Sequence, residues 1–154
     1  MKVVFLDIDG VLNSNKEMIQ FGHMWVKTKD VKHKLSPFGT WVMQRLSAHD
    51  VKIVLSSTWR LGTGPEEWKE VFDFPIYDKT CSCPFPGSVR GDEIALWLKE
   101  HPGVERYVII DDDSDMLEEQ MANFVKTNGM EGLTFFDSCK VCEILGLSIY
   151  DLKD

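Results

Sequence analysis

The sequence predicts an α/β protein in which a parallel sheet is covered by helices on both faces. Short apolar segments alternate along the chain with amphipathic ones, the order expected when successive parallel strands are joined by helices. Three apolar segments, at 2–7, 51–55 and 106–110, are nearly continuous, as in strands that are buried on both faces. We therefore expect a three-layer α/β/α sandwich around a central parallel sheet.

The first long helix is predicted from its capping residues and its apolar periodicity. Ser36 can cap a helix that begins at Pro37, because proline fits the first helical turn. Trp41, Val42 and Leu46 recur at helical spacing, so we expect them to share the buried face of this helix.

The other elements are expected from the same kinds of signal. Thr134 can cap a closing helix that Gly146 ends, although the pattern leaves residues 133–136 open to a strand. Residues 14–36 are polar and are expected to be irregular. The remaining expected elements are helices at 65–72 and 90–100, a short helix from 114, strands at 74–77 and 123–126, and the closing helix at 135–146.

Length and composition restrict the classes of protein to consider. A chain of 154 residues fits one domain, so residues 1–154 are expected to form a single unit. Apolar residues make up 44% of the chain, which is enough for a sizeable core and argues against disorder. The formal net charge of −8 argues against broad binding along a nucleic acid backbone, but it is compatible with a local basic pocket that grips one phosphate.

The apolar pattern also predicts a cytoplasmic protein without a membrane partner. No apolar run approaches the roughly 18 residues of a membrane span, and Asp7 interrupts the first apolar segment. In the cytoplasm the four cysteines would be reduced thiols. The pair Cys81 and Cys83 and the pair Cys139 and Cys142 leave a four-thiolate zinc site open, but we favour ordinary helix burial for the second pair.

Polar residues follow each of the three clear strands. The first strand is followed by Asp-Ile-Asp at 7–9, the second by Ser-Ser-Thr at 56–58 and the third by three aspartates at 111–113. The carboxyl ends of parallel strands lie at one edge of the sheet, where such sheets bind their ligands. We therefore expect the three clusters to meet in one pocket.

The paired carboxylates Asp7 and Asp9 predict a metal ion in this pocket. Two bare carboxylates are costly in a core, but beyond the strand end Gly10 lets the chain turn so that both face the pocket. Crowded carboxylates repel one another unless a cation lies among them, and oxygen ligands in an open site favour Mg²⁺ with a phosphorylated substrate. The alternative, a plain turn with a solvated Asp7, explains one cluster but not three.

Four sequence motifs resemble those of the haloacid dehalogenase (HAD) superfamily of phosphohydrolases. The stretches "FLDIDGVLN", "KIVLSSTWR", "VRGDEIALWL" and "YVIIDDDSD" follow the family's order over about residues 3–115. The later stretch "NFVKTNGMEGLT" resembles small members related to the phosphatase domains of RNA-repair and polynucleotide end-healing enzymes. The resemblance implies a Rossmann-like core with a minimal cap or none.

The resemblance implies roles for the acidic residues. Asp7 would be the nucleophile that forms an aspartyl phosphate, and Asp9 would protonate the leaving oxygen and then activate water. Mg²⁺ would be held by the Asp7 carboxylate, by Asp9 through its backbone carbonyl, and by an acid of the pair Asp111 and Asp112. Asp115 would support the metal site, and the remaining acid at 113 would face solvent.

The resemblance also implies which residues hold the transferring phosphoryl group. Ser56 and Ser57 stand at the second motif, and Arg90 takes the place that a lysine usually fills in the third. Lys79 is the rival cation. Arg60 follows the serines, and we expect it to face the pocket and contact the substrate.

An open pocket is expected because no segment is long enough for a separate cap domain. Residues 13–36 and 58–90 are both short for an independent core. An open pocket would accept a phosphate on a nucleic acid end or a phosphoprotein, or a nucleotide with Met24 and Trp25 forming a partial wall. For Trp59 we favour a place in the core over stacking on a base.

The sequence therefore predicts a Mg²⁺-dependent phosphatase that acts on a nucleotide or a polynucleotide end. Two alternatives stay open: a regulatory protein that binds or sequesters a phosphorylated ligand without turnover, and a phosphoprotein phosphatase. The sequence does not identify the substrate or the oligomeric state.

Overall fold

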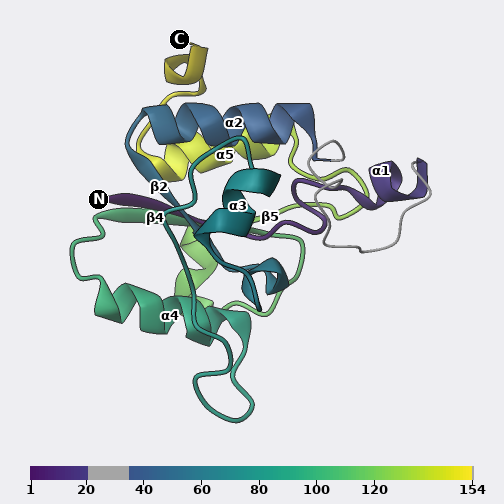
Figure 1. Ribbon diagram of the computed structural model, residues 1–154. Coiled ribbons are helices and arrows are strands. Elements are labelled where there is room, and N and C mark those ends of the chain that lie inside the picture. The colour runs from purple at the N-terminus through teal and green to yellow at the C-terminus, as the bar shows by residue number, and fades with distance from the viewer. Residues whose placement is uncertain (21–34, 154) are drawn as a thin grey trace.

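The protein is built on a five-stranded parallel sheet with the strand order β3-β2-β1-β4-β5 (Figure 1). The computed structural model describes residues 1–20 and 35–153. The predicted three-layer α/β/α architecture with a central parallel sheet is confirmed. The strands are β1 (Lys2–Leu6), β2 (Val51–Leu55), β3 (Asp78–Lys79), β4 (Arg106–Asp111) and β5 (Phe124–Lys126).

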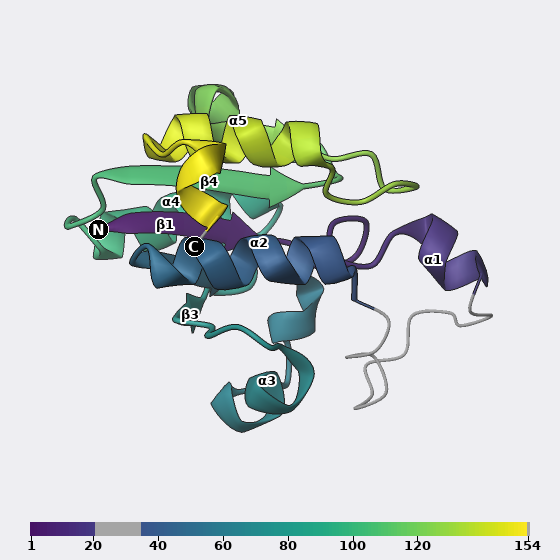
Figure 2. The same ribbon diagram turned by 90° about the horizontal axis from the view of Figure 1, so that it is seen from above.

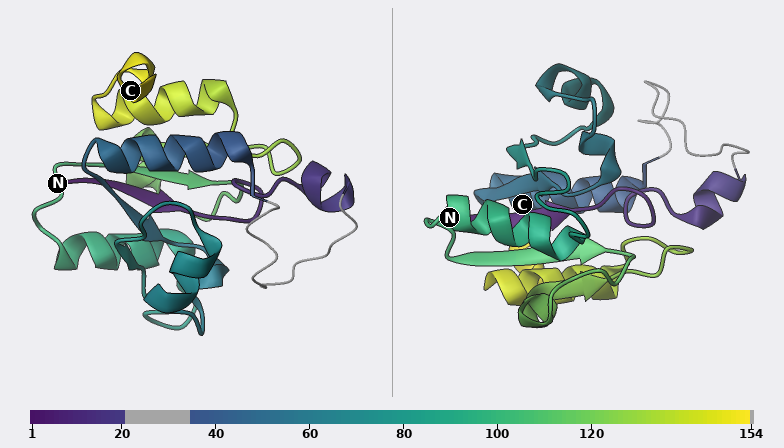
Figure 3. Two further views of the ribbon diagram at one scale, coloured as in Figure 1. Left: turned by 45° about the horizontal axis from the view of Figure 1, so that its top comes forward. Right: turned by 90° about the horizontal axis from the view of Figure 1, so that it is seen from below.

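Helices cover both faces of this sheet. Helices α2 and α5 lie on one face and α4 lies on the other (Figure 3). The α-helices are α1 (Asn15–Gln20), α2 (Pro37–Ala48), α3 (Pro65–Val71), α4 (Arg90–Glu100) and α5 (Phe135–Leu145). Three 3₁₀ helices complete the described chain: η2 (Thr58–Arg60), η3 (Glu118–Asn123) and η4 (Ile149–Lys153).

The two faces of β1 fill two separate cores because side chains alternate along a strand. Val4 and Leu6 pack in the larger core with residues of α2 and α5, whereas Val3 and Phe5 pack in the smaller core against α4. All four side chains are fully buried. Burial on both faces explains why β1 has a continuous apolar sequence in place of an alternating one.

The predicted helix caps are present. The Ser36 hydroxyl accepts a hydrogen bond from the Gly39 N–H at 3.1 Å at the start of α2. Thr134 and Asp137 form a reciprocal capping box at the start of α5, and Gly146, with φ +65°, ends that helix. These caps decide that the stretch 133–136 forms the start of a helix and not a strand, with Thr134 as the N-cap and Phe135 as the first helical residue.

Several expected elements differ in the structure. Trp41 does not lie on the buried face of α2: its ring is 37% exposed and stacks on Phe38. The strand expected at 74–77 is β3 at Asp78–Lys79. Pairing with β2 starts with the Tyr77 N–H, which donates to the Ile53 carbonyl, whereas Phe74 packs in the core.

Two further expectations also need correction. The stretch 14–36, expected to be irregular, contains α1, which starts with a capping box between Ser14 and Glu17. The short helix expected from 114 is the 3₁₀ helix η3, which begins later at Glu118.

Residues 58–90 form η2, α3 and β3 at one side of the sheet and carry no separate cap domain within the part of the chain described here. Met24 and Trp25, the proposed pocket wall, lie outside the described residues. In the described chain, no helix has the length and the apolar character that crossing a membrane requires.

The cysteines do not form a four-thiolate site among the described residues. Cys81 and Cys83 are exposed on the loop after β3, whereas Cys142 is buried in α5 beside the half-buried Cys139. Within the described ranges, the side chains that cluster closely enough to hold a metal ion are aspartates and not cysteines.

Candidate active site

The register of three adjacent strands brings the predicted polar clusters together. Leu6 of β1 lies opposite Leu55 of β2 and Ile110 of β4, so the next residues, Asp7, Ser56 and Asp111, emerge side by side. Backbone hydrogen bonds continue the sheet at this point, from the Asp7 N–H to the Ile110 carbonyl at 3.0 Å and from the Ser56 N–H to the Leu6 carbonyl at 3.1 Å. The site therefore has a rigid base.

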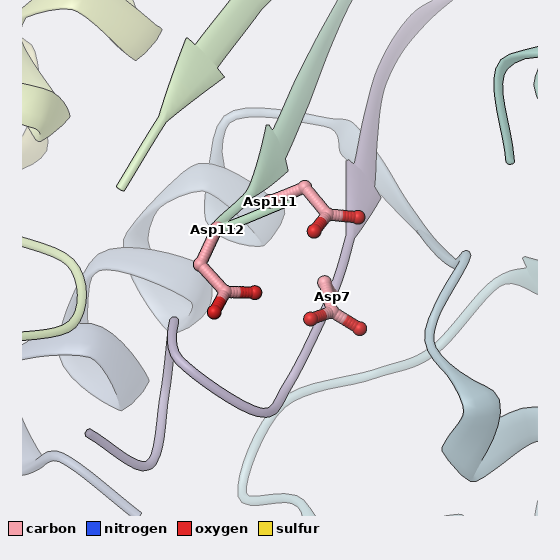
Figure 4. Close-up of side chains that lie close together, drawn as sticks. All are labelled: Asp7, Asp111 and Asp112. Carbon is pink, nitrogen blue, oxygen red and sulfur yellow. The ribbon is translucent and has the colours of Figure 1, made fainter. Parts of the chain in front are cut away.

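Three carboxylates meet at the ends of β1 and β4. Asp7, Asp111 and Asp112 each place a carboxylate oxygen within 4.8 Å of the other two, and their side chains point toward a common space (Figure 4). Asp7 and Asp111 are buried, and Asp112 is half-buried. Asp111 Oδ2 is buried without a hydrogen-bond partner among the described residues. Arg90 Nε lies 3.3 Å from this oxygen, so a metal ion would share it with the Arg90 guanidinium.

Burial makes ionisation of these carboxylates unfavourable. It raises the pKa of Asp7 to about 6, although the charge of Arg90 and the hydroxyl of Ser57 partly offset the effect. The pKa of Asp111 is raised to about 7, first by burial and then by the charge of Asp7. Burial also raises the pKa of Asp112. A cation among these groups would favour their charged forms.

The chemistry of this donor set fits Mg²⁺. The ligands are carboxylate oxygens in an open site, which suits a hard ion that keeps several of its waters.

Asp112 is held close to two glycines: a side chain on Gly10, which has φ +78°, would collide with its carboxylate, and one on Gly129 would come within 2.7 Å of its Oδ2. Asp7, Asp111 and Asp112 would hold the ion, and the predicted role of the Asp9 carbonyl stays a prediction.

The Asp9 side chain is not part of the group formed by the three carboxylates, and both of its oxygens accept hydrogen bonds. The indole Nε1–H of Trp59 donates to Asp9 Oδ2 at 2.9 Å, and the amide of Asn13 donates to Asp9 Oδ1 at 2.8 Å. Both donor residues are buried. Asp9 is therefore oriented as a second, independent carboxylate beside Asp7.

Sequence reasoning missed these two donors. Trp59 lies in the core next to Phe72, as favoured, but its polar edge also reaches the site. Asn13 stands four residues after Asp9 and interrupts an otherwise apolar turn. Because a buried amide needs a hydrogen-bond partner, this residue could have indicated a polar contact near Asp9. Its partner depends on how the turn folds.

Arg90, and not Lys79, provides the cation in the site. Arg90 Nη1 lies 3.4 Å from Asp7 Oδ1 and also donates to the Ser56 carbonyl, and its Nε lies 3.3 Å from Asp111 Oδ2. Lys79 instead donates to the carbonyls of Arg60 and Thr63, at 3.2 and 3.0 Å.

Asp115 supports the cation without touching the carboxylate cluster. Its carboxylate accepts from the Arg90 N–H at 3.3 Å, and its carbonyl accepts from the Gly91 N–H at 3.0 Å. Asp113 is exposed, in keeping with its expected place in solvent. Asp115 thus fixes the start of α4, from which Arg90 reaches the site.

The two serines play different parts. The Ser57 hydroxyl is close enough to Asp7 to lower the pKa of that carboxyl. Ser56 is fully buried and turns its carbonyl to Arg90, while its hydroxyl has no hydrogen-bond partner in the described chain.

The loop after β5 and helix α1 border the site on its other side. The Thr127 hydroxyl donates to the Gly10 carbonyl at 2.9 Å, and the Asn15 N–H donates to the Gly129 carbonyl at 2.8 Å. Both segments project beyond the strand ends (Figure 2). They connect the turn after Asp9 to the far edge of the sheet.

The comparisons with known proteins agree with this geometry. Residues 3–137 match the family described as the HAD domain in Swiss Army Knife RNA repair proteins. The chain belongs to this family. It is therefore a HAD-type phosphatase domain, as the motifs predicted. No curated protein and no solved structure matches the chain.

Arg60 has a supporting place in this HAD domain, in contrast to the substrate contact expected from the sequence. It is 4% exposed, and its five N–H groups are all engaged by partners from three segments. Nη2 pairs with Glu93 at 2.6 Å, and the remaining bonds run to the carbonyls of Ser56, Ser57, Thr80 and Cys81. Arg60 therefore joins the ends of β2 and β3 to α4 beneath the site.

Replacing Glu93 with alanine should destabilise the protein strongly. The substitution leaves the Arg60 charge buried without its counter-ion, which costs about 3–5 kcal/mol in free energy of unfolding. The matched control is Glu66→Ala, which removes an exposed pair with Lys69 and should cost less than about 1 kcal/mol. Urea unfolding of both variants tests this, and equal losses would contradict the role given to Arg60.

The carboxylate cluster should make the metal-free HAD domain less stable as pH rises. An unfolded aspartate has a pKa of 3.8, whereas Asp7 and Asp111 have values of about 6 and about 7, so the folded protein holds more protons between these values. This contribution to stability is complete below the unfolded pKa and is lost as pH rises through about 6 to 7.

Urea unfolding between about pH 5 and pH 8, with and without Mg²⁺, measures this loss. Saturating Mg²⁺ should remove it, and Asp111→Asn should reduce it in the metal-free protein. If the free energy of unfolding of the metal-free protein rose with pH as steeply as that of the Mg²⁺-bound protein, the assignment of these two carboxylates would be wrong.

Proposed function

We propose that this HAD domain is a Mg²⁺-dependent phosphomonoesterase that works through an aspartyl phosphate and acts on a phosphorylated polynucleotide end or nucleotide. One observation carries the proposal: the buried Asp7 faces a cation and two further acids, while a second carboxylate, Asp9, is held separately beside it. This arrangement provides a nucleophile and a proton donor that do not compete for the same partners.

The first half of the reaction would transfer the phosphoryl group to the protein. A carboxylate oxygen of Asp7 forms a bond to phosphorus as the ester bond from phosphorus to the leaving oxygen breaks. Asp9 gives a proton to that oxygen, which departs as an alcohol. The hydrogen bonds from Trp59 and Asn13 keep the Asp9 carboxyl aligned during this transfer.

The second half would release phosphate. Asp9, now a carboxylate, accepts a proton from water, and the water oxygen attacks phosphorus as the bond to the Asp7 oxygen breaks. Inorganic phosphate leaves, and both carboxyl groups return to their starting states. The same residue therefore serves first as an acid and then as a base.

Arg90 and Ser57 would hold the oxygens of the phosphoryl group. The Arg90 guanidinium carries a permanent charge next to Asp7, and the Ser57 hydroxyl lowers the pKa of the same carboxyl. Mg²⁺ bound by Asp7, Asp111 and Asp112 would supply further positive charge where the transition state develops negative charge. Without this charge, the carboxylate would repel the incoming phosphate.

A polynucleotide end is the favoured substrate. The family description refers to RNA repair proteins, which supports RNA as the polynucleotide for this chain. The net charge of −8 supports contact near the phosphorylated end over contact along a long strand. Sequestration without turnover is less favoured. The two hydrogen bonds that orient the Asp9 carboxyl would serve proton transfer, whereas simple binding of a phosphate does not need them. Location in the cytoplasm stays a prediction.

Asp7→Asn should abolish phosphate release. The amide is a poor nucleophile, so release from 4-nitrophenyl phosphate and from phosphorylated oligonucleotides in Mg²⁺ should fall by about 10⁴-fold. Because the substitution removes a buried charge, the variant should unfold at no lower urea concentration than the metal-free parent protein, which separates lost chemistry from lost folding. If the parent protein releases no phosphate from a broad panel of phosphoesters, the proposal is wrong.

Trp59→Phe should lower the catalytic rate without greatly changing substrate affinity. Phenylalanine keeps an aromatic ring in the core but removes the hydrogen bond to Asp9 Oδ2, so kcat should fall about tenfold while KM changes by less than about twofold. Trp68→Phe is the control, because the Trp68 indole donates to Thr63 outside the site. Steady-state kinetics of both variants decide the question: a kcat that falls equally in the two would refute the orienting role of Trp59.

A further inference from the structure

A hollow of about 290 Å³ lies beside the active site and has no role in the reaction described above. Residues 60–62 and 79–82 line it. These two segments follow the ends of β2 and β3, so the hollow opens at the sheet edge that carries the active site. Its volume is at the low end of the range for small-ligand sites and suits one unit of a polymer.

A short chain of contacts connects the hollow to Asp7. Arg60, which lines the hollow, donates to the Ser56 carbonyl at 2.8 Å, and Arg90 donates to the same carbonyl. Arg90 in turn lies 3.4 Å from Asp7. The guanidinium groups of Arg60 and Arg90, which donate to the same backbone carbonyl, therefore lie between the hollow and Asp7.

One wall of the hollow follows directly in the chain from the residue that holds Asp9. Asp9, the proton donor, is held by the indole of Trp59, so the leaving oxygen must lie beside Asp9 and Trp59. The chain continues directly from Trp59 into Arg60, Leu61 and Gly62, which form one wall of the hollow. This wall is therefore the part of the hollow that a large leaving group beside Asp9 would meet first.

The walls of the hollow offer the contacts that a nucleotide needs. Lys79 places its ammonium at the rim, where bonds to the Arg60 and Thr63 carbonyls fix it with two of its three N–H groups. Leu61 presents an apolar side chain that is 47% exposed.

We propose that this hollow receives the nucleotide that carries the terminal phosphate, and that Lys79 neutralises the first phosphodiester beyond it. This inference rests on the proposed phosphatase function and adds the subsite that would distinguish a polynucleotide end from a small phosphoester. A single lysine at the rim of an otherwise acidic protein agrees with contact to one phosphodiester and not to a long strand.

The test compares one small and one polymeric substrate in the full chain. The substrates are 4-nitrophenyl phosphate and tetranucleotides of RNA that carry a phosphate at the 3′ or the 5′ end. The variants are Lys79→Gln, which removes the charge, Lys79→Arg, which keeps it, and Ser82→Glu, which adds an opposing charge at an exposed position. Lys69→Gln is the matched control, since it removes an exposed lysine of α3 outside this hollow.

We expect Lys79→Gln and Ser82→Glu to lower the ratio of kcat/KM for the better tetranucleotide to that for 4-nitrophenyl phosphate by about fivefold. Lys79→Arg should restore the ratio, and Lys69→Gln should leave it as in the parent protein. In Lys79→Gln the slope of log kcat/KM for the tetranucleotide against log salt concentration should become shallower by about 0.7, as expected for one lost phosphate contact to a single strand.

Three results would overturn the proposal. An unchanged ratio in Lys79→Gln and Ser82→Glu, with 4-nitrophenyl phosphate still hydrolysed, would remove the subsite and leave the phosphatase function standing. Equal dependence on Lys79 and Ser82 for a phosphoserine peptide would assign the hollow to a protein substrate. Absence of phosphate release from every ester by the parent protein would remove both the function and the subsite.

Discussion

The site depends on the register of β1 between β2 and β4. Because Leu6 is paired on both sides, the residue that follows it must stand next to the residues that follow its two partners. The sheet therefore forces Asp7 and Asp111 together, although their like charges repel. Backbone hydrogen bonds hold this spacing, so the carboxylates cannot move apart to relieve the repulsion.

Most of the surrounding structure compensates for this crowding. Arg90 contacts both buried carboxylates, and the start of its helix is held by Asp115. The shifted pKa values of Asp7 and Asp111 are consequences of the same burial. A protein that keeps such a cluster without a cation carries a standing electrostatic cost, which is the physical reason to expect a metal ion as part of the working site.

A second layer of buried polar contacts gives the site its shape. Arg60 ties the ends of β2 and β3 to α4 through Glu93, and Trp59 and Asn13 fix the direction of Asp9. Neither set belongs to the carboxylate cluster, yet both support the residues that stand beside it. The consecutive residues Trp59 and Arg60 thus hold Asp9 and the end of β2 from one short 3₁₀ turn.

The features that the sequence determined by itself are those set by local chemistry. Apolar runs that end in aspartates identified the strands and their polar ends, and Ser36, Thr134 and Gly146 marked helix ends because capping needs only near neighbours. The parallel orientation of the strands then followed from the alternation of strands and helices along the chain.

Tertiary structure alone decided which way individual side chains face and where they find partners. Trp41 has the right spacing for the buried face of α2 but is left on the surface. Arg60 follows the site residues in sequence, but two of the three segments that bind its guanidinium are distant in the chain. Trp59 meets Asp9 across fifty residues of chain. Such contacts depend on distances in the folded protein, and a one-dimensional pattern contains no information about which buried donor will meet which buried acceptor.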